Sequence, residues 1–275
     1  MKPRPFDYVR PDTVEEAVAV LAEHGDATRV LAGGQSLMAM LNLRLADADI
    51  LVDIAQIKEL DAIRDLGDKV EVGAAVTQNG LLDWPHLGVK LPLLAAALPF
   101  VGHFQTRNKG TVCGSIAHAD PSSELPLSLA VLAGEVVLRS HRGTRVLAAS
   151  DFQQDMLTTA CEPDELITAV RFPIMSGRGM AFREVARRHG DFAIIAVAAV
   201  MESANAVRLG VGGMTGRPAV RRIPADGAAA VREAIATFAD ELGGYEDIHA
   251  SARMRRDLLC CIGPAVIAEA RTCAA

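Results

Sequence analysis

Aromatic residues are scarce in this sequence, making up 4% of its 275 residues, although half of all residues are hydrophobic. This composition favours cores packed from aliphatic and small side chains and lacks the signature of a disordered chain. Long apolar runs are also missing. The longest cover residues 192–201 and the proline-interrupted 91–101, whereas a membrane span needs about 18 residues. We therefore expect no membrane-spanning helix.

An excess of basic residues is absent too. Lys and Arg number 28 against 34 Asp and Glu, which gives a formal net charge of -6. Nucleic acids are bound mainly through clustered Lys and Arg, so we expect no nucleic-acid partner. The N-terminal segment MKPRPFDYVRP lacks the apolar stretch and small-residue cleavage site of a secretory signal. The sequence therefore predicts a cytoplasmic protein.

Cysteine patterns typical of metal sites are not found. None of the five cysteines belongs to a C-x-x-C pair. Adjacent Cys260 and Cys261 fall on a predicted helix, where neighbouring side chains point in different directions. We therefore predict that this chain holds neither zinc nor an iron–sulfur cluster, and we assign no metal ligand.

The chain length favours two or three modules over one core. A capping pattern at Thr13 and Glu16, followed by apolar positions and Gly25, predicts a helix over 13–24. The glycine-containing segment 174–179 follows a proline and is the preferred boundary before a third module. Expected strands cover 28–31, 50–54, 69–76, 136–139, 145–147, 166–172, 180–185, 192–201 and 207–211; expected helices cover 13–24, 37–43, 78–84, 226–242 and 250–270, with Pro264 bending or interrupting the last.

Two small-residue loops are the most informative local features. Residues 32–36 (AGGQS) follow a predicted strand, and residues 111–115 (TVCGS) come about 80 residues later. Glycine lets backbone N–H groups approach an anion closely, so the pyrophosphate of a dinucleotide could lie between the loops. The Rossmann alternative requires G-x-G-x-x-G after a first strand. Residues 210–216 come close, but Thr215 occupies the last glycine position, which favours a strand end and turn.

Four segments carry a resemblance to a known family. They are AGGQSL, RNKGTVCGSIAHADPSSELP, RRHGDFAIIAVAAV and EDIHASARMRRDLL, and together they span most of the chain. In order and spacing the first three resemble segments of the FAD-binding medium subunits of molybdenum hydroxylases, the xanthine dehydrogenase and carbon monoxide dehydrogenase type, and the fourth resembles the C-terminal helix signature of that family. The resemblance implies an α+β fold in which two N-terminal α/β FAD-binding subdomains of PCMH type, 1–57 and 58–175, precede a C-terminal α+β domain, 179–275.

The resemblance also implies partners and a role. A small subunit would carry two [2Fe–2S] clusters, and a large subunit would carry the molybdenum cofactor at which substrate is hydroxylated. Electrons would pass through the clusters to FAD on this chain and then to an external acceptor: dioxygen, NAD, a quinone or another carrier. The whole would be a dimer of heterotrimers, and the substrate pocket would lie on the large subunit.

Cofactor contacts are carried over motif by motif, with no catalytic acid or base on this chain. The resemblance implies Ala32, Gly33, Gly34, Gln35, Ser36, Thr111, Gly114 and Ser115 at the pyrophosphate; Glu124 at ribityl or ribose hydroxyls; Val101, His103 and Phe192 near the isoalloxazine; and Ile167, whose backbone would meet the adenine half. A carboxylate such as Glu124 suits paired hydroxyl donors.

Each assignment competes with a structural interpretation. A diglycine after a strand is more often a turn, and Phe192 could simply fill a core. Cys113 stands where many relatives carry glycine and is interpreted as a small buried side chain. Asp120 is expected to cap a helix before Pro121. His118 is expected to pack or hydrogen-bond, because the hydroxylation base belongs to another subunit in this family.

Two other function classes remain open beside the electron-transferring subunit. A self-contained flavin oxidoreductase would be reduced directly by its own small substrate. A scaffold that has lost flavin would stay colourless even when FAD is supplied.

Overall fold

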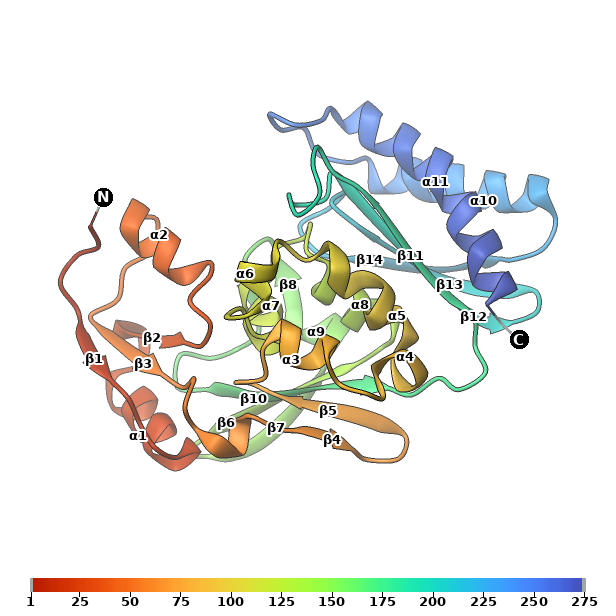
Figure 1. The fold of residues 1–275 in the computed structure, drawn as a ribbon. Helices are drawn as coiled ribbons and strands as arrows, with labels where there is room; N and C mark the ends of the chain where they lie inside the picture. Colours follow the sequence, from red (N-terminus) through yellow and green to blue (C-terminus); the bar gives the residue numbers. More distant parts are fainter. Residues whose placement is uncertain (1, 274–275) are drawn as a thin grey trace.

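The computed structural model describes residues 2–273, which form three larger sheets and one two-stranded sheet with helices around them (Figure 1). Met1 and residues 274–275, at the outer ends of the predicted first and third domains, lie outside the described residues.

The first sheet is small and parallel, with strand order β1-β3-β2. The Thr13 hydroxyl accepts from the Glu16 N–H at 3.2 Å, and Gly25 ends the helix at a φ of 47°, as the sequence predicts. The elements are β1 (Asp7–Val9), α1 (Val14–His24), the 3-10 turn η1 (Gly25–Ala27), β2 (Thr28–Leu31), α2 (Leu37–Leu43), β3 (Ile50–Asp53) and η2 (Lys58–Leu60).

The second sheet is antiparallel, with strand order β4-β5-β10-β6-β7, and short helices lie between it and the third sheet (Figure 1). Its strands are β4 (Ile63–Asp65), β5 (Lys69–Gly73), β6 (Glu135–Ser140), β7 (Gly143–Ala148) and β10 (Leu166–Pro173). The helices are α3 (Gln78–Leu82), α4 (Leu87–Lys90), α5 (Pro92–Ala97), η3 (Leu98–Phe100), α6 (Phe104–Arg107), α7 (Val112–His118), α8 (Glu124–Val131) and α9 (Ala149–Phe152); a small hairpin pairs β8 (Gln153–Asp155) with β9 (Thr158–Thr159).

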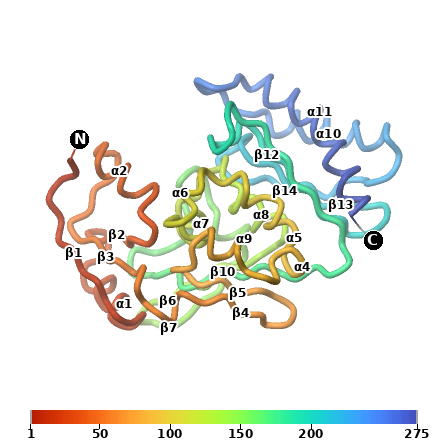
Figure 2. The backbone as a smooth tube through the Cα atoms, in the orientation of Figure 1, coloured from red at the N-terminus to blue at the C-terminus, as the bar shows by residue number. Residues whose placement is uncertain are grey.

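The third sheet is an antiparallel meander, reached through residues 174–179 (Figure 2). Helices α10 and α11 cover one face, and α5 and α8 cover the other. Its elements are β11 (Met180–Val185), β12 (Ile195–Ser203), β13 (Ala206–Gly212), β14 (Ala219–Pro224), α10 (Ala228–Leu242) and α11 (Ala252–Thr272).

Strand β12 is apolar along most of its length because both of its faces are buried. Ala196, Ala198 and Val200 point into the main core shared with the second sheet. The alternate positions, including Ile195 and Val197, point into a separate core beneath α10 and α11. The period-2 geometry of a strand thus divides one hydrophobic run between two cores.

Several sequence expectations need correction. The strand predicted over 192–201 begins only at Ile195, and the strand predicted over 69–76 ends at Gly73. Asp120 does not cap a helix: its carboxylate accepts from the Ser122 N–H at 2.8 Å in a turn, and Ser123 is the N-cap of α8. Pro264 lies within α11 without dividing it into two helices. Within residues 2–273, no helix is both long enough and apolar enough to cross a bilayer.

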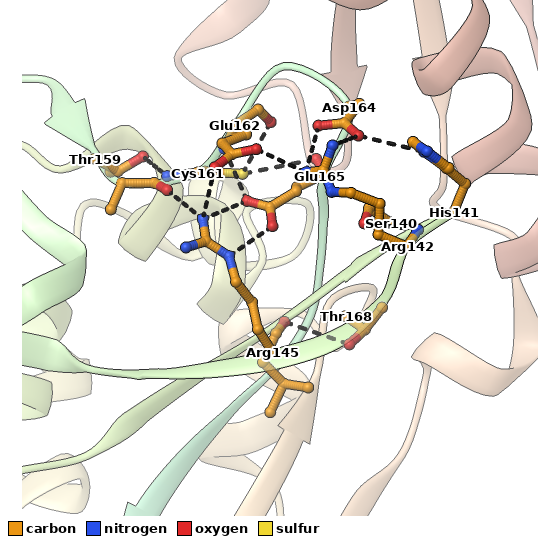
Figure 3. A network of polar contacts seen from close by, with 12 residues as sticks. Ser140, His141, Arg142, Arg145, Thr159, Cys161, Glu162, Asp164, Glu165 and Thr168 are labelled. Atoms are coloured by element: carbon orange, nitrogen blue, oxygen red, sulfur yellow. Dashed lines mark hydrogen bonds and ion pairs between the residues drawn. The ribbon is translucent and has the colours of Figure 1, made fainter.

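Ion pairs fasten the β6–β7 hairpin to the segment before β10 (Figure 3). Arg145 forms a bidentate pair with Glu165, with N···O distances of 2.6 and 2.7 Å, and also donates to the Ala160 carbonyl. Arg142 pairs with Glu162 and Asp164. The Glu165 side chain is only 3% exposed, so its charge depends on Arg145 for compensation.

We expect Arg145→Met to destabilise the chain by about 2–3 kcal/mol. Breaking a buried pair costs more than this, but Arg145 is partly exposed and solvent screens the loss. Urea unfolding at neutral pH measures the change. Arg139→Met on the neighbouring strand is the matched control, because Arg139 donates only to the neutral Thr144 hydroxyl in this hairpin. Equal stability of the two variants would contradict the role given to the pair.

Candidate functional site

The two glycine loops meet at one point. A Cβ atom on residue 33 would lie 2.0 Å from the Lys109 carbonyl oxygen and 2.7 Å from the Gly110 Cα. No side chain fits there. The first loop therefore packs directly on the backbone that leads into the second loop, and this contact requires glycine at residue 33. From the sequence, the expected reason for the glycine was the close approach of an anion.

The first loop joins β2 to α2 through a tight turn. Gly34 has a φ of 67°, a conformation that favours glycine. The Gln35 side chain donates to the Gly33 carbonyl at 3.0 Å. Ala32, Gly33, Gly34 and Ser36 are half-buried and Gln35 is exposed, so the loop backbone lies at the surface of the first unit.

The second loop opens α7. Thr111 is buried and its hydroxyl accepts from the Gly114 N–H at 2.9 Å. Gly114 and Ser115 follow in the first turn, half-buried. Thr111 also bridges Thr77, the N-cap of α3, so two short helices begin side by side.

Gln78 supplies an orphaned polar group at this junction. Its backbone N–H donates to the Gly110 carbonyl at 2.8 Å. Its side-chain oxygen is buried and has no hydrogen-bond partner among residues 2–273, yet it lies 3.1 Å from the position of a Cβ on Gly110. A buried amide oxygen without a donor is costly, and this one lies beside the predicted pyrophosphate loops.

A second group of predicted residues lies where the helices next to the second sheet touch the segment before β12 of the third sheet. Gly190 packs on the His103 ring, since a Cβ there would lie 2.6 Å from His103 Cε1. Val101 is buried, and its carbonyl accepts from Arg107 Nη1 at 3.0 Å. The structure thus brings Val101 and His103 against the segment that carries Phe192.

Phe192 is 60% exposed and precedes β12, so the interpretation that it fills a core is wrong. It borders a cleft of about 740 Å³ together with Asp120, Ser122 and Leu157. Glu124 comes two residues after Ser122, in the first turn of α8.

Glu124 is almost fully buried, at 4% exposure. Burial, with a smaller contribution from the Asp120 charge, raises the pKa of Glu124 to about 7. Burial and the Glu124 charge raise the pKa of Glu184, on β11, to about 8. One Glu184 carboxylate oxygen is buried without a partner among the described residues. Two carboxyl groups thus share a site in which hydroxyl donors would satisfy them.

Only the backbone of Ile167 is available for a contact with a ligand, because the residue is 8% exposed and its side chain belongs to the main core. The pairing of β10 with β6 is irregular between Ile167 and Ala169. The Arg145–Glu165 pair fixes the chain just before this irregularity.

The remaining candidates have structural roles. Cys113 is buried, burial raises the pKa of its thiol, and Sγ donates to the Val72 carbonyl at 3.5 Å, which confirms the interpretation as a small buried side chain. Gly213 lies in a turn directly after β13, and its backbone N–H donates to the Pro121 carbonyl at 2.8 Å. Among the described residues, no three His, Cys, Asp or Glu side chains gather as metal ligands would.

Sequence reasoning missed Gln78, Glu184 and the contact of Gly33 with Lys109. Glu184 follows Arg183 near the end of β11, so nothing in the pattern of the strand sets it apart. Nothing local marks Gln78, because its environment comes from residues about 30 positions away.

Comparison with known proteins places this site in context. Residues 4–175 match the family described as FAD binding domain in molybdopterin dehydrogenase. The chain is 41% identical to the caffeine dehydrogenase subunit beta of Pseudomonas sp. strain CBB1 over 195 residues, which cover 70% of this chain and 66% of that subunit. It is 34% identical to the nicotine 6-hydroxylase medium subunit of Paenarthrobacter nicotinovorans, over 94% and 95% of the two chains.

Solved structures agree with the sequence matches. A carbon monoxide dehydrogenase chain from Hydrogenophaga pseudoflava superposes with a TM-score of 0.90 at 30% identity, covering 100% of both chains. Quinoline 2-oxidoreductase from Pseudomonas putida 86 gives 0.92 at 31%, covering 100% of this chain and 99% of that one. These matches confirm the predicted α+β fold.

We expect the apo chain to lose stability between pH 4.5 and about 8, because Glu124 and Glu184 stay protonated in the folded state and ionise in the unfolded one. Glu124→Gln should remove up to about 3 kcal/mol of this loss in the free energy of unfolding. The figure follows from a pKa difference of roughly two and a half units between the folded and unfolded states, at 1.36 kcal/mol per unit. Urea unfolding at the two pH values measures it, with exposed Glu233→Gln as control. A Glu124→Gln variant with the wild-type pH profile would show that Glu124 is not held neutral.

Proposed function

The chain belongs to the FAD-binding medium subunits of the molybdenum hydroxylases, and from that premise we propose that it relays electrons from partner [2Fe–2S] clusters, through one noncovalent FAD, to an external acceptor. The observation that carries the proposal is the contact of the two glycine loops at Gly33 and Lys109–Gly110. That contact brings two stretches of anion-binding backbone, about 80 residues apart in sequence, to one place.

The residues at the site fit this cofactor. The backbones of 32–36 and of Thr111, Gly114 and Ser115 would hold the pyrophosphate. The orphaned Gln78 oxygen and the carboxyl group of Glu124 match the hydroxyl and amino donors of a nucleotide and a ribityl chain.

The remaining predicted contacts lie at the two ends of the site. We propose that the Ile167 backbone meets the adenine half, and that Val101, His103 and Phe192 lie along the isoalloxazine. Exposed Phe192 has a free aromatic face for this contact.

Bound FAD supplies a carrier that accepts electrons from one-electron donors and passes them on singly or in pairs. This chain's residues bind it, orient it and limit the access of water. No residue of this chain is assigned a proton transfer in substrate hydroxylation. Phe192 borders the cleft, and we propose that its ring controls how the acceptor reaches the flavin.

The relatives named above are subunits of multi-subunit dehydrogenases or hydroxylases. We propose a small subunit with two [2Fe–2S] clusters, a large subunit with the molybdenum cofactor and the substrate pocket, and a cytoplasmic dimer of heterotrimers. We also propose that 1–57, 58–175 and 179–275 act as separate domains, the first two enclosing FAD and the third closing over it.

Cofactor extraction and reduction test the proposal together. Denaturing the purified chain should release intact FAD, one per chain, and the bound flavin should be reduced by substrate only when the partner subunits are present. Recovery of FMN or a nicotinamide cofactor would overturn the FAD assignment. Direct reduction of the isolated chain by a small substrate would instead favour a self-contained oxidoreductase, and a chain that stays colourless with added FAD would favour a scaffold.

We expect Gly33→Ala to weaken FAD binding by more than about 150-fold, or over about 3 kcal/mol, because its Cβ would force the two loops apart. Gly88→Ala is the control, since a Cβ at residue 88 has open space around it. Glu124→Ala should cost less, about 1–3 kcal/mol for one charge-assisted hydrogen bond. Fluorescence titration of the apo variants with FAD measures all three. Wild-type affinity in a folded Gly33→Ala variant would remove the loop contact from the site.

A further inference from the structure

We propose that Arg255 is a positioning residue for the flavin: it clamps the base of the segment 186–194 and so sets where Phe192 stands. The proposal deepens the proposed function and rests on it, because it takes Phe192 to lie at the isoalloxazine. Arg255 belongs to α11, more than 60 residues after Phe192 in sequence.

Arg255 is buried to 1% exposure, although it carries a full charge. Its Nη1 donates to the carbonyls of Ile194 and Gly213, the latter at 2.7 Å. Its Nη2 pairs with Asp247 Oδ2 at 2.6 Å. A buried guanidinium is tolerated when its charge is compensated in this way. Of its three nitrogens, only Nε is buried without a hydrogen-bond partner among the described residues.

The clamped carbonyl lies where the segment ends. The Ile194 N–H donates to the Val185 carbonyl at 2.7 Å, which closes the base of the loop between β11 and β12. On the other side, Gly213 has a φ of 79°, and a Cβ there would lie 2.6 Å from the Ile194 oxygen. Phe192 comes two residues before this fixed point, so its freedom is limited by how firmly Ile194 is held.

Arg255 also reaches the opposite wall of the cleft. Its guanidinium carbon lies 4.2 Å from the centre of the Tyr245 ring, as in a cation–π contact. The Tyr245 and Ser122 hydroxyls hydrogen-bond at 3.4 Å. Ser122 is two residues before Glu124, so one side chain links the Phe192 segment to the turn that precedes the predicted ribityl contact.

The chemistry requires arginine in particular. Two carbonyl oxygens and one carboxylate converge on the planar head, and a guanidinium presents donors in a fixed fork that matches them. An ammonium group would present a compact charge without this geometry. We therefore expect Arg255→Lys to recover less than half of what is lost when the guanidinium is removed, because lysine keeps the charge but not the fork of donors.

Proteolysis of the full chain without FAD tests the clamp itself. Trypsin cleaves after Arg187 and Arg188, whose side chains are 54% and 75% exposed. Arg255→Met should speed this cleavage about fivefold or more by releasing the base of the segment. Leu259→Ala is the matched control, because it removes a buried side chain one turn later on α11. If Leu259→Ala speeds cleavage as much at equal loss of Tm, the role of Arg255 is only structural and the proposal fails.

A double-mutant cycle in the assembled holoenzyme tests the link to the flavin. Phe192→Ala and Arg255→Met should each change the flavin midpoint potential and reoxidation rate, and Arg255→Met should add little once Phe192 is gone. Additive effects would overturn the positioning role. An unchanged flavin in Phe192→Ala alone would overturn the placement of Phe192 and leave FAD binding by the loops standing. Should Arg255→Met fail to fold, Tyr245→Leu replaces it in both experiments, with a smaller effect expected because the Arg255–Asp247 pair remains.

Discussion

The fit of Gly33 against the Lys109–Gly110 backbone is the constraint on which the rest of the site depends. This contact has no room for even a methyl group, so it fixes the first unit against the second without any side chain at residue 33. Backbone N–H groups near a glycine turn and at a helix start then lie close together. Neither stretch would be a specific anion site alone; their separation in the chain makes the site depend on the fold.

The elements that the sequence predicted well have local causes. Helix α1 begins and ends at common capping residues, namely Thr13 with Glu16 at its start and Gly25 at its end. The apolar run that ends near Val200 is explained by a strand that is buried on both faces. The short helices α4 to α9 were missed because helices of one or two turns are held by packing that no local pattern reveals. Phe192 was placed in a strand because an apolar run does not show where pairing begins. The sequence cannot distinguish a helix cap from a turn at Asp120, because an Asp-Pro pair occurs in both.

The electrostatics of the site depend on groups far apart in sequence. The charge of Glu124, on α8, helps to raise the pKa of Glu184, on β11, while Arg255 neutralises Asp247 and binds the carbonyls of Ile194 and Gly213, which flank β12 and β13. Motif matching identified Glu124 and Phe192 as candidates. It could not reveal that burial raises the pKa of Glu124 or that Phe192 lies in a segment held by Arg255, because both properties arise from tertiary contacts.

Hydrogen exchange on the apo chain, followed with and without added FAD, shows whether both loops bind the cofactor. We expect slower exchange of backbone amides in both 32–36 and 111–115 when FAD binds, because one pyrophosphate would engage donors from both loops. Protection confined to one loop, or appearing instead in the glycine-rich 210–216, would contradict it.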